Sequence, residues 1–237
     1  MIPPRLWLRT TLAALLAFAC LFTLAGPLPA VAQDDAGADK IYEPANTCVR
    51  LTLPENWRPA QVWAENPAAA EQPGGLLFAG EAFAPTGEAV TGFNVNRLPG
   101  IEIPSEVFPL MTQAEQNEFC QSLLKSFAES FTRTTGVAPV GTKAMIKRLG
   151  GWYTIMLTAR FISGDTDIII NQVAYSLPDR MISLTFYTQA PLIAVMAPDM
   201  AYILENFNPD TSLAPREAAP RRSGETLDDY LIRIKNP

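Results

Sequence analysis

The chain has 237 residues, of which 48% are hydrophobic and 18% are charged, and its formal net charge is −6. This length and composition are typical of one globular domain with a core of its own. The acidic balance argues against sequence-independent nucleic-acid binding, which needs clustered lysine and arginine to displace the counterions of the phosphates.

The start of the chain has the pattern of a secretory signal peptide. Two arginines near the start of the chain are followed by residues 12–24, which are nearly all apolar. The Ala-Val-Ala sequence of residues 30–32 has the small-x-small pattern of a signal-peptidase cleavage site. We therefore expect residues 1–32 to be removed, which leaves a periplasmic or secreted protein that begins near Gln33. Two arginines leave with this leader, so the formal net charge becomes −8. Without the leader we expect no stable membrane insertion.

Two other fates of the leader stay open. Residues 6–28 are about long enough to span a bilayer, so an uncleaved leader would anchor the protein. Pro27 and Pro29 beside the Ala-x-Ala sequence favour cleavage instead. Cys20 is a candidate for lipidation, but Phe18 places a bulky ring where a lipidation signal has a small residue.

Behind the leader, residues 33–46 are small, polar and acidic, and we expect a flexible lead-in. The predicted domain covers residues 47–209 and opens with an alternating strand in the sequence CVRLTLPENW. Residues 54–75 contain four prolines and predict a long loop, which carries Trp57 and Trp63.

Two strands and a helix follow the loop. Residues 76–83 and 89–98 predict two strands joined by an Ala-Pro-Thr-Gly turn. Thr112 and Glu115 have the spacing of a capping box, and Gly136 marks a helix end. Between these signals an apolar face with helical spacing predicts packing on a sheet. The residues of this face are Cys120, Leu123, Leu124, Phe127 and Phe131.

The next part of the chain, residues 137–187, predicts a meander of four strands. Stretches of alternating apolar residues are separated by Gly-Gly, Gly-Asp and Pro-Asp sequences, which are typical of the turns of hairpins. A closing helix is predicted within Pro191–Phe207, starting again at Pro198, because proline fits the first turn of a helix.

Residues 210–237 are interpreted as a linker and a short helical tail. Leu227, Tyr230, Leu231 and Ile234 recur at helical spacing. Two interpretations stay open: the tail packs back on its own domain, or it is a tethered docking segment for another protein. The linker has few groups that pack, so we expect a chain truncated after Leu213 to stay folded.

Signals of chemistry are missing from the sequence. There is no histidine, which removes the commonest general base and the usual transition-metal ligand. No Gly-x-Ser-x-Gly, Gly-x-Gly-x-x-Gly, phosphate loop or Cys-x-x-Cys is found. We therefore expect no catalytic, cofactor-binding or metal-binding residues, and no enzyme activity.

The tryptophans and cysteines are the remaining candidates for a role. Trp57, Trp63 and Trp152 either close the core or form a ligand or partner surface. With Cys20 removed, Cys48 and Cys120 are an even pair in an oxidising compartment. They form a disulfide if Cys48 faces the predicted helix, and otherwise both are inert buried thiols.

The order of the predicted elements resembles the PsbP-like group, whose relatives include the DcrB-type envelope proteins. The resemblance covers residues 41–209 and is carried by LTLPENW, GGWYTIMLTARF, RMISLTFYT and YILENF. It implies an α+β fold, an α/β/α sandwich with a central antiparallel sheet, in proteins that serve mainly as non-catalytic binding or assembly factors. No set of catalytic residues comes with the group. The long loop and the tail after Pro215 depart from a minimal member.

These observations predict a periplasmic or secreted binding or assembly factor that acts on another protein of the cell envelope. The identity of that partner is not contained in the sequence. The alternative function is a carrier of a small apolar or lipid-like ligand, with the three tryptophans lining a pocket between the sheet and the loop.

Overall fold

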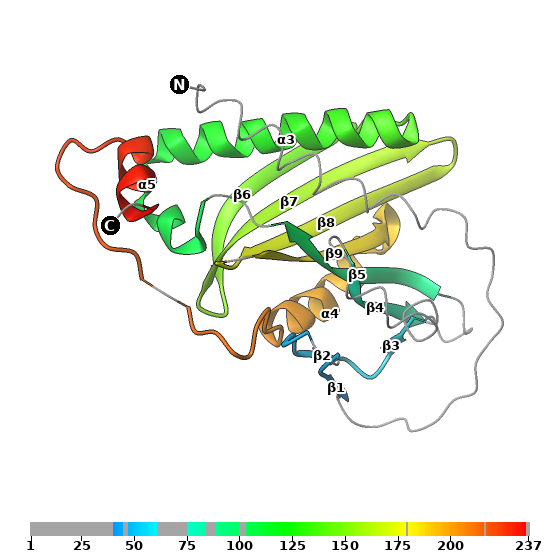
Figure 1. Cartoon of the computed structure of the whole chain (residues 1–237). Coiled ribbons are helices and arrows are strands. Elements are labelled where there is room, and N and C mark those ends of the chain that lie inside the picture. Colours follow the sequence, from blue (N-terminus) through cyan, green and yellow to red (C-terminus); the bar gives the residue numbers. More distant parts are fainter. Residues whose placement is uncertain are drawn as a thin grey trace.

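The protein is an α/β/α sandwich built on one antiparallel sheet (Figure 1). The computed structural model describes residues 40–44, 47–60, 75–83, 89–99, 103–178, 180–215 and 217–235. The strands of the central sheet are β3 (Trp57–Pro59), β4 (Leu76–Phe83), β5 (Ala89–Pro99), β6 (Gly141–Leu149), β7 (Trp152–Ser163), β8 (Thr166–Ser176) and β9 (Arg180–Gln189). Their order across the sheet is β3-β4-β5-β9-β8-β7-β6, and each neighbouring pair is antiparallel.

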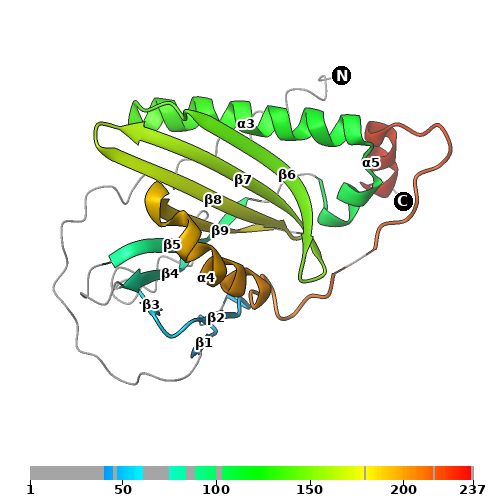
Figure 2. The same ribbon diagram turned by 180° about the vertical axis from the view of Figure 1, so that it is seen from behind.

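Helices lie on both faces of this sheet. Among the described residues they are α3 (Gln113–Thr135), α4 (Ile193–Glu205), α5 (Leu227–Lys235) and two short 3₁₀ helices, Ser105–Leu110 and Ala190–Leu192. One core cluster holds the apolar face of α3, and a second holds α4. Adjacent residues of β8, Ala174 and Tyr175, belong to different clusters, and side chains alternate along a strand, so α3 and α4 cover opposite faces (Figure 2). The predicted α/β/α sandwich is confirmed.

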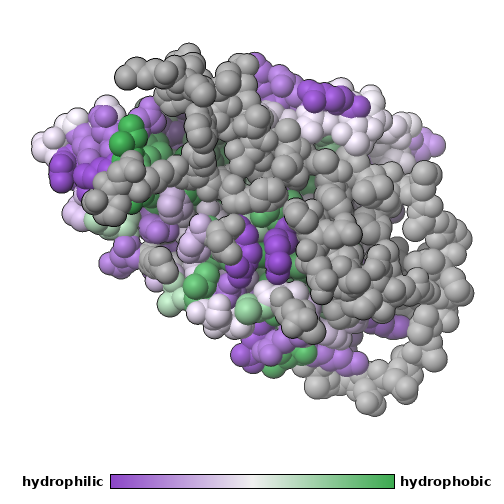
Figure 3. Space-filling view, viewed as in Figure 1, coloured by the Kyte–Doolittle hydropathy of each residue, from purple (hydrophilic) through white to green (hydrophobic). Residues whose placement is uncertain are grey.

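The helix α3 has the ends that its sequence predicts. The Glu115 N–H donates to Thr112 Oγ1, and the Thr112 N–H donates to Glu115 Oε2, which completes the capping box. At the other end Gly136 has a φ of 74°, in the left-handed region where glycine is favoured. The predicted apolar face is buried, with Leu124 partly covered, and the rings of Phe131 and Phe161 stack with centroids 3.9 Å apart. Hydrophilic and intermediate residues cover the outer side of α3 (Figure 3).

The opening strand lies outside the central sheet. Val49, Leu51 and Leu53 are buried, so the predicted alternation is confirmed. However, β2 (Leu51–Leu53) pairs with β1 (Lys40–Tyr42) in a separate two-stranded sheet. Three residues of the predicted flexible lead-in therefore form a strand.

The region predicted as one long loop also contains a strand of the main sheet. Trp57–Pro59 forms β3, which pairs with β4 at one end of the strand order. Residues 61–74 lie outside the described part of the chain. The predicted strands over 76–83 and 89–98 and the four-strand meander are confirmed.

The closing helix differs from its prediction at Pro198. The helix α4 begins at Ile193 and continues through Pro198, so proline is inside the helix and does not start it. Proline removes one backbone hydrogen bond and strains the preceding turn. Met196, Met200 and Ile203 are buried on the sheet on both sides of this position, and this packing holds the helix together across the proline.

Candidate functional site

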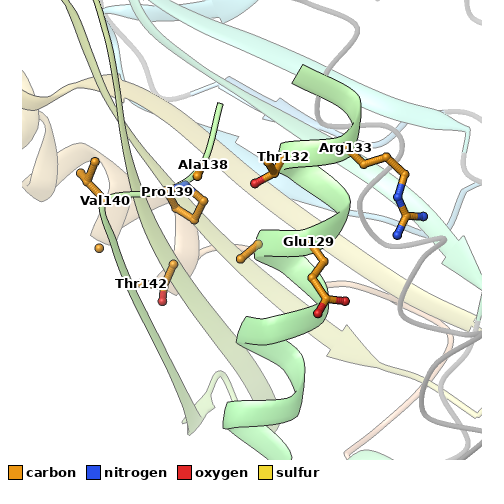
Figure 4. Close-up of a pocket in the computed structure, with 9 residues that line it drawn as sticks. Glu129, Thr132, Arg133, Ala138, Pro139, Val140 and Thr142 are labelled. Carbon is orange, nitrogen blue, oxygen red and sulfur yellow. The ribbon is translucent and has the colours of Figure 1, made fainter. Parts of the chain in front are cut away.

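An open groove runs between the second half of α3 and the start of β6 (Figure 4). Its volume is about 700 Å³. The residues that line it are Ala128, Glu129, Thr132, Arg133, Ala138, Pro139, Val140, Gly141 and Thr142. In Figure 4 the Thr132 side chain points toward the strand, whereas Arg133 points away from it.

The local sequence makes this groove. The chain turns back at Gly136, and β6 begins at Gly141, so the last turns of α3 stay beside the start of the strand. Small residues on both sides keep the space open. A Cβ atom at Gly141 would meet nothing within 4 Å. Val140, at the groove's rim, has 60% of its surface exposed although it is apolar.

The strand β6 is the edge of the sheet beside this groove. In the described part of the chain its only ladder is with β7, and its residues are exposed or half-buried. The Thr154 hydroxyl of β7 donates to the Lys147 carbonyl at 2.8 Å, so the backbone of Lys147 faces β7. Because backbone direction alternates along a strand, the N–H and C=O groups of Ala144 and Ile146 face outward. An edge of this kind is a template for a further strand.

The charge on this edge has one sign. β6 contains Lys143, Lys147 and Arg148 and no acidic residue, although the whole chain has a formal net charge of −6. Among the described residues no carboxylate forms an ion pair with Lys143 or Lys147. The Arg148 guanidinium lies 5.7 Å from the centre of the Tyr153 ring. The edge therefore attracts anionic groups.

The two described tryptophans do not form the predicted surface. Trp57 is 2% exposed, and its Nε1–H donates to Asp199 Oδ2 at 3.0 Å. Trp152 is also buried, at the start of β7, five positions from β3 in the strand order. The hollow beside Trp152 has a volume of only about 10 Å³. Both side chains are core residues, and the rest of the loop that would close the predicted pocket, residues 61–74, lies outside the described residues. Trp63 lies outside the described residues.

The predicted docking tail packs on its own domain. Tyr230 is 1% exposed within the cluster beneath α3, and Leu227, Leu231 and Ile234 pack against that cluster. In the preceding linker, the Arg221 guanidinium donates to the Leu110 carbonyl and to Glu115 Oε2, which joins the linker to the start of α3 (Figure 1). In the structure the tail therefore packs on its own domain, which is the first of the two interpretations.

The two cysteines are not bonded to each other, which contradicts the disulfide that the sequence left open. The other outcome, two inert buried thiols, is wrong for Cys48 and holds only for the burial of Cys120. Cys48 is exposed and Cys120 is buried, and both are free thiols. Cys120 belongs to the cluster beneath α3, while Val49, next to Cys48, belongs to the cluster beneath α4. The sheet therefore separates the two positions. Burial raises the pKa of the Cys120 thiol, which makes its reactive thiolate scarcer at neutral pH.

Within the described residues, no group of three or more potential metal ligands comes together. No described helix has the length and hydrophobicity to cross a bilayer. The groove and the β6 edge can contribute backbone hydrogen bonds, positive charge and a small apolar contact. These are the properties of a binding surface.

Sequence reasoning missed this surface. One signal was available, namely the run of basic residues without an acid in GTKAMIKRL, residues 141–149. Pairing between distant segments decides which strand of a meander lies at the edge of the sheet. The sequence therefore did not show that these basic residues lie on an edge strand.

No protein-family model matches the chain, and neither does any curated protein sequence. Similar solved structures include the solution structure of cyanobacterial PsbP (CyanoP) from Synechocystis sp. PCC 6803, with 12% identity, 75% of this chain and 97% of that chain covered, and a TM-score of 0.48. They also include LpqN, involved in cell envelope biogenesis of Mycobacterium tuberculosis, with 13% identity, 77% and 88% covered, and a TM-score of 0.40.

A third similar structure is a Pseudomonas aeruginosa protein of unknown function, PA94, with 13% identity, 77% and 100% covered, and a TM-score of 0.34. Likeness at these TM-scores does not support a transfer of function. Membership of the PsbP-like group and the likeness to DcrB-type proteins therefore stay predictions. The arrangement of this chain's own residues is the basis for a functional proposal.

Proposed function

We propose that the chain is an exported, non-catalytic binding or assembly factor that acts on another protein of the cell envelope. The observation that carries this proposal is the β6 edge with the adjoining groove, a surface that no other described segment covers. The leader pattern of residues 1–32 supports export to the periplasm or beyond.

A protein partner fits this surface better than a small ligand. Sites for small molecules are clefts or cavities that bury most of the ligand's surface and are lined mainly by hydrophobic and aromatic side chains. The groove is open, and exposed lysines lie along the adjoining strand. Trp57 and Trp152, two of the tryptophans that a ligand pocket would have used, are in the core. The ligand carrier therefore has no specific observation in its favour.

Site-specific photo-crosslinking in cells tests the proposal. A photo-crosslinking amino acid replaces Val140 at the rim of the groove, and a matched control replaces Val195 on α4, which is 70% exposed. We expect a discrete protein adduct from position 140 that is absent from position 195. If position 140 gives no protein adduct, or if both positions give the same adducts, this surface is not a specific partner site.

A further inference from the structure

We propose that β6 takes up an extended acidic segment of the partner as an additional strand of the sheet. This inference rests on the proposed function and adds the conformation and charge of the bound segment. It follows from two properties of one strand: the backbone groups that face outward, and side chains that carry positive charge only.

The two ends of the described sheet differ in their ability to pair. At one end, β3 has three residues and includes Pro59. A short edge strand with a proline is poorly suited to further pairing, since proline has no N–H to donate. At the other end, β6 has nine residues and no proline. The N–H and C=O groups of Ala144 and Ile146 point away from β7 and are the main-chain contacts that a bound strand would use.

The side chains of β6 define the chemistry of the bound segment. Ala144 and Ile146 pack against the cluster beneath α3, so the alternate residues Lys143, Met145 and Lys147 lie on the opposite face. A strand laid against β6 would match the two lysines with acidic residues four positions apart. Between them it would place an apolar residue opposite Met145 and two more opposite Ala144 and Ile146. The expected pattern is acidic, three apolar residues, acidic.

A second copy of the chain is a poor occupant of the same edge. In the antiparallel register that pairs all nine residues of β6 with a second β6, Lys143 lies opposite Lys147 at two places. Like charges directly opposite each other destabilise a strand pair. Lysine on an edge strand opposes self-association, and the same charges favour an acidic partner.

A synthetic peptide tests the inference directly. The probe is a fluorescein-labelled peptide with the core Glu-Asp-Val-Leu-Ile-Glu-Thr, and binding to the purified protein is followed by fluorescence anisotropy. We expect saturable binding, weaker at higher salt because the ion pairs are exposed. Hydrogen exchange should show new protection at the amides of Ala144 and Ile146. No saturable binding at up to about 1 mM peptide, a very weak affinity, would overturn the inference.

Two pairs of variants separate backbone pairing from charge. Ala144→Pro removes an outward N–H and should abolish binding, whereas Ala144→Val keeps the N–H and should not. Reversing both lysines, Lys143→Glu with Lys147→Glu, should weaken binding about tenfold, and a peptide with lysine in place of its acidic residues should bind this double variant. Arg50→Glu, at an exposed position outside the central sheet, is the control for a change of charge. Binding that is unaffected by Ala144→Pro would overturn the inference.

The same variants distinguish this inference from the proposed function. If the Val140 crosslink persists in the Ala144→Pro chain and in the double lysine variant, the partner binds elsewhere, which overturns the inference and leaves the proposed function standing. If the free protein sediments as a dimer that Ala144→Pro dissociates, a second copy occupies the edge and the inference is wrong. Absence of any protein adduct in cells counts against the proposed function, whatever the peptide does.

Discussion

The Asp210 side chain is fully buried, and its contacts hold the segment after α4 against the domain. Its carboxylate pairs with Arg180 of β9, and it accepts hydrogen bonds from the Ser212 N–H at 2.8 Å and from the Ser212 hydroxyl at 2.5 Å. Nearby, the Thr211 N–H donates to the Cys48 carbonyl at 2.7 Å. A buried ion pair with further hydrogen bonds changes the stability of a protein little. Removing one member destabilises the fold strongly, because the other charge stays buried without its partner.

We expect Asp210→Ala to destabilise the protein by about 3 kcal/mol, because it leaves the partly buried Arg180 guanidinium without this carboxylate. Urea unfolding followed by circular dichroism measures the change. Asp228→Ala, at an exposed position of α5, is the control and should shift the free energy of unfolding by less than about 0.5 kcal/mol. Equal effects of the two substitutions would show that the buried ion pair contributes little.

Glu225 makes part of the tail's stability depend on pH. The Arg233 Nε–H donates to Glu225 Oε1 at 2.7 Å, and the Arg222 backbone N–H donates to Oε2 at 2.9 Å. The bond from Arg233, followed by that from Arg222, lowers the pKa of the Glu225 carboxyl from 4.5 to about 2. Since the folded-state pKa is the lower one, this contribution is fully present above pH 4.5 and is lost as the pH falls toward 2.

We expect Arg233→Gln to weaken the dependence of stability on pH in the window from 4.5 to 2. Urea unfolding of both proteins across this window, with Ile232→Ala as a control that keeps Glu225 and Arg233, provides the comparison. If the wild type and the Arg233→Gln variant lose stability in parallel as the pH falls, the ion pair is not the source of the dependence.

At the scale of elements, α5 belongs to the domain and is not a removable tail. Tyr230 is in the core, its hydroxyl donates to the Ala219 carbonyl at 2.8 Å, and Arg221 fixes the linker to the start of α3. The expectation that a chain truncated after Leu213 stays folded is therefore revised: that truncation would expose the end of the cluster beneath α3.

We expect Tyr230→Ala to destabilise the protein by about 3 to 5 kcal/mol, as for other buried aromatic side chains. Tyr230→Phe removes only the hydroxyl and its hydrogen bond and should cost about 1 kcal/mol. Ile232→Ala, at a position 61% exposed on the same helix, is the matched control and should cost less than about 0.5 kcal/mol. A Tyr230→Ala effect as small as that of the control would mean that α5 detaches without consequence for the domain.

At the scale of the whole molecule, the central sheet separates the two free cysteines: Cys120 belongs to the cluster beneath α3, whereas Cys48 is exposed next to Val49 of the cluster beneath α4. In a Cys20→Ser chain we expect one thiol to react rapidly with Ellman's reagent in the native state, that of the exposed Cys48. The second, Cys120, should react only after unfolding, because it is buried and its pKa is raised. Two thiols should titrate in denaturant without a reductant. If no thiol titrates in denaturant, the two cysteines form a disulfide and this prediction is wrong.

Much of this fold could be predicted from local patterns. The capping box of Thr112 and Glu115, the left-handed end at Gly136 and the alternation of the meander strands depend on residues close in sequence, so they were recognisable in advance. The resemblance of their order to the PsbP-like group also implied helices on both faces of an antiparallel sheet, which the structure has.

The rest depends on contacts between distant residues, which no local pattern contains. The helix α4 continues through Pro198 because it packs on the sheet on both sides of the proline. Tyr230 is a core residue and not a docking residue because the cluster beneath α3 has space for its ring. The alternation of CVRLTL showed two faces but not which helix each would meet, so the disulfide was left open and the structure contradicts it. The candidate site has the same origin: the sequence contains the lysines of β6, and only the pairing of the sheet makes that strand an edge.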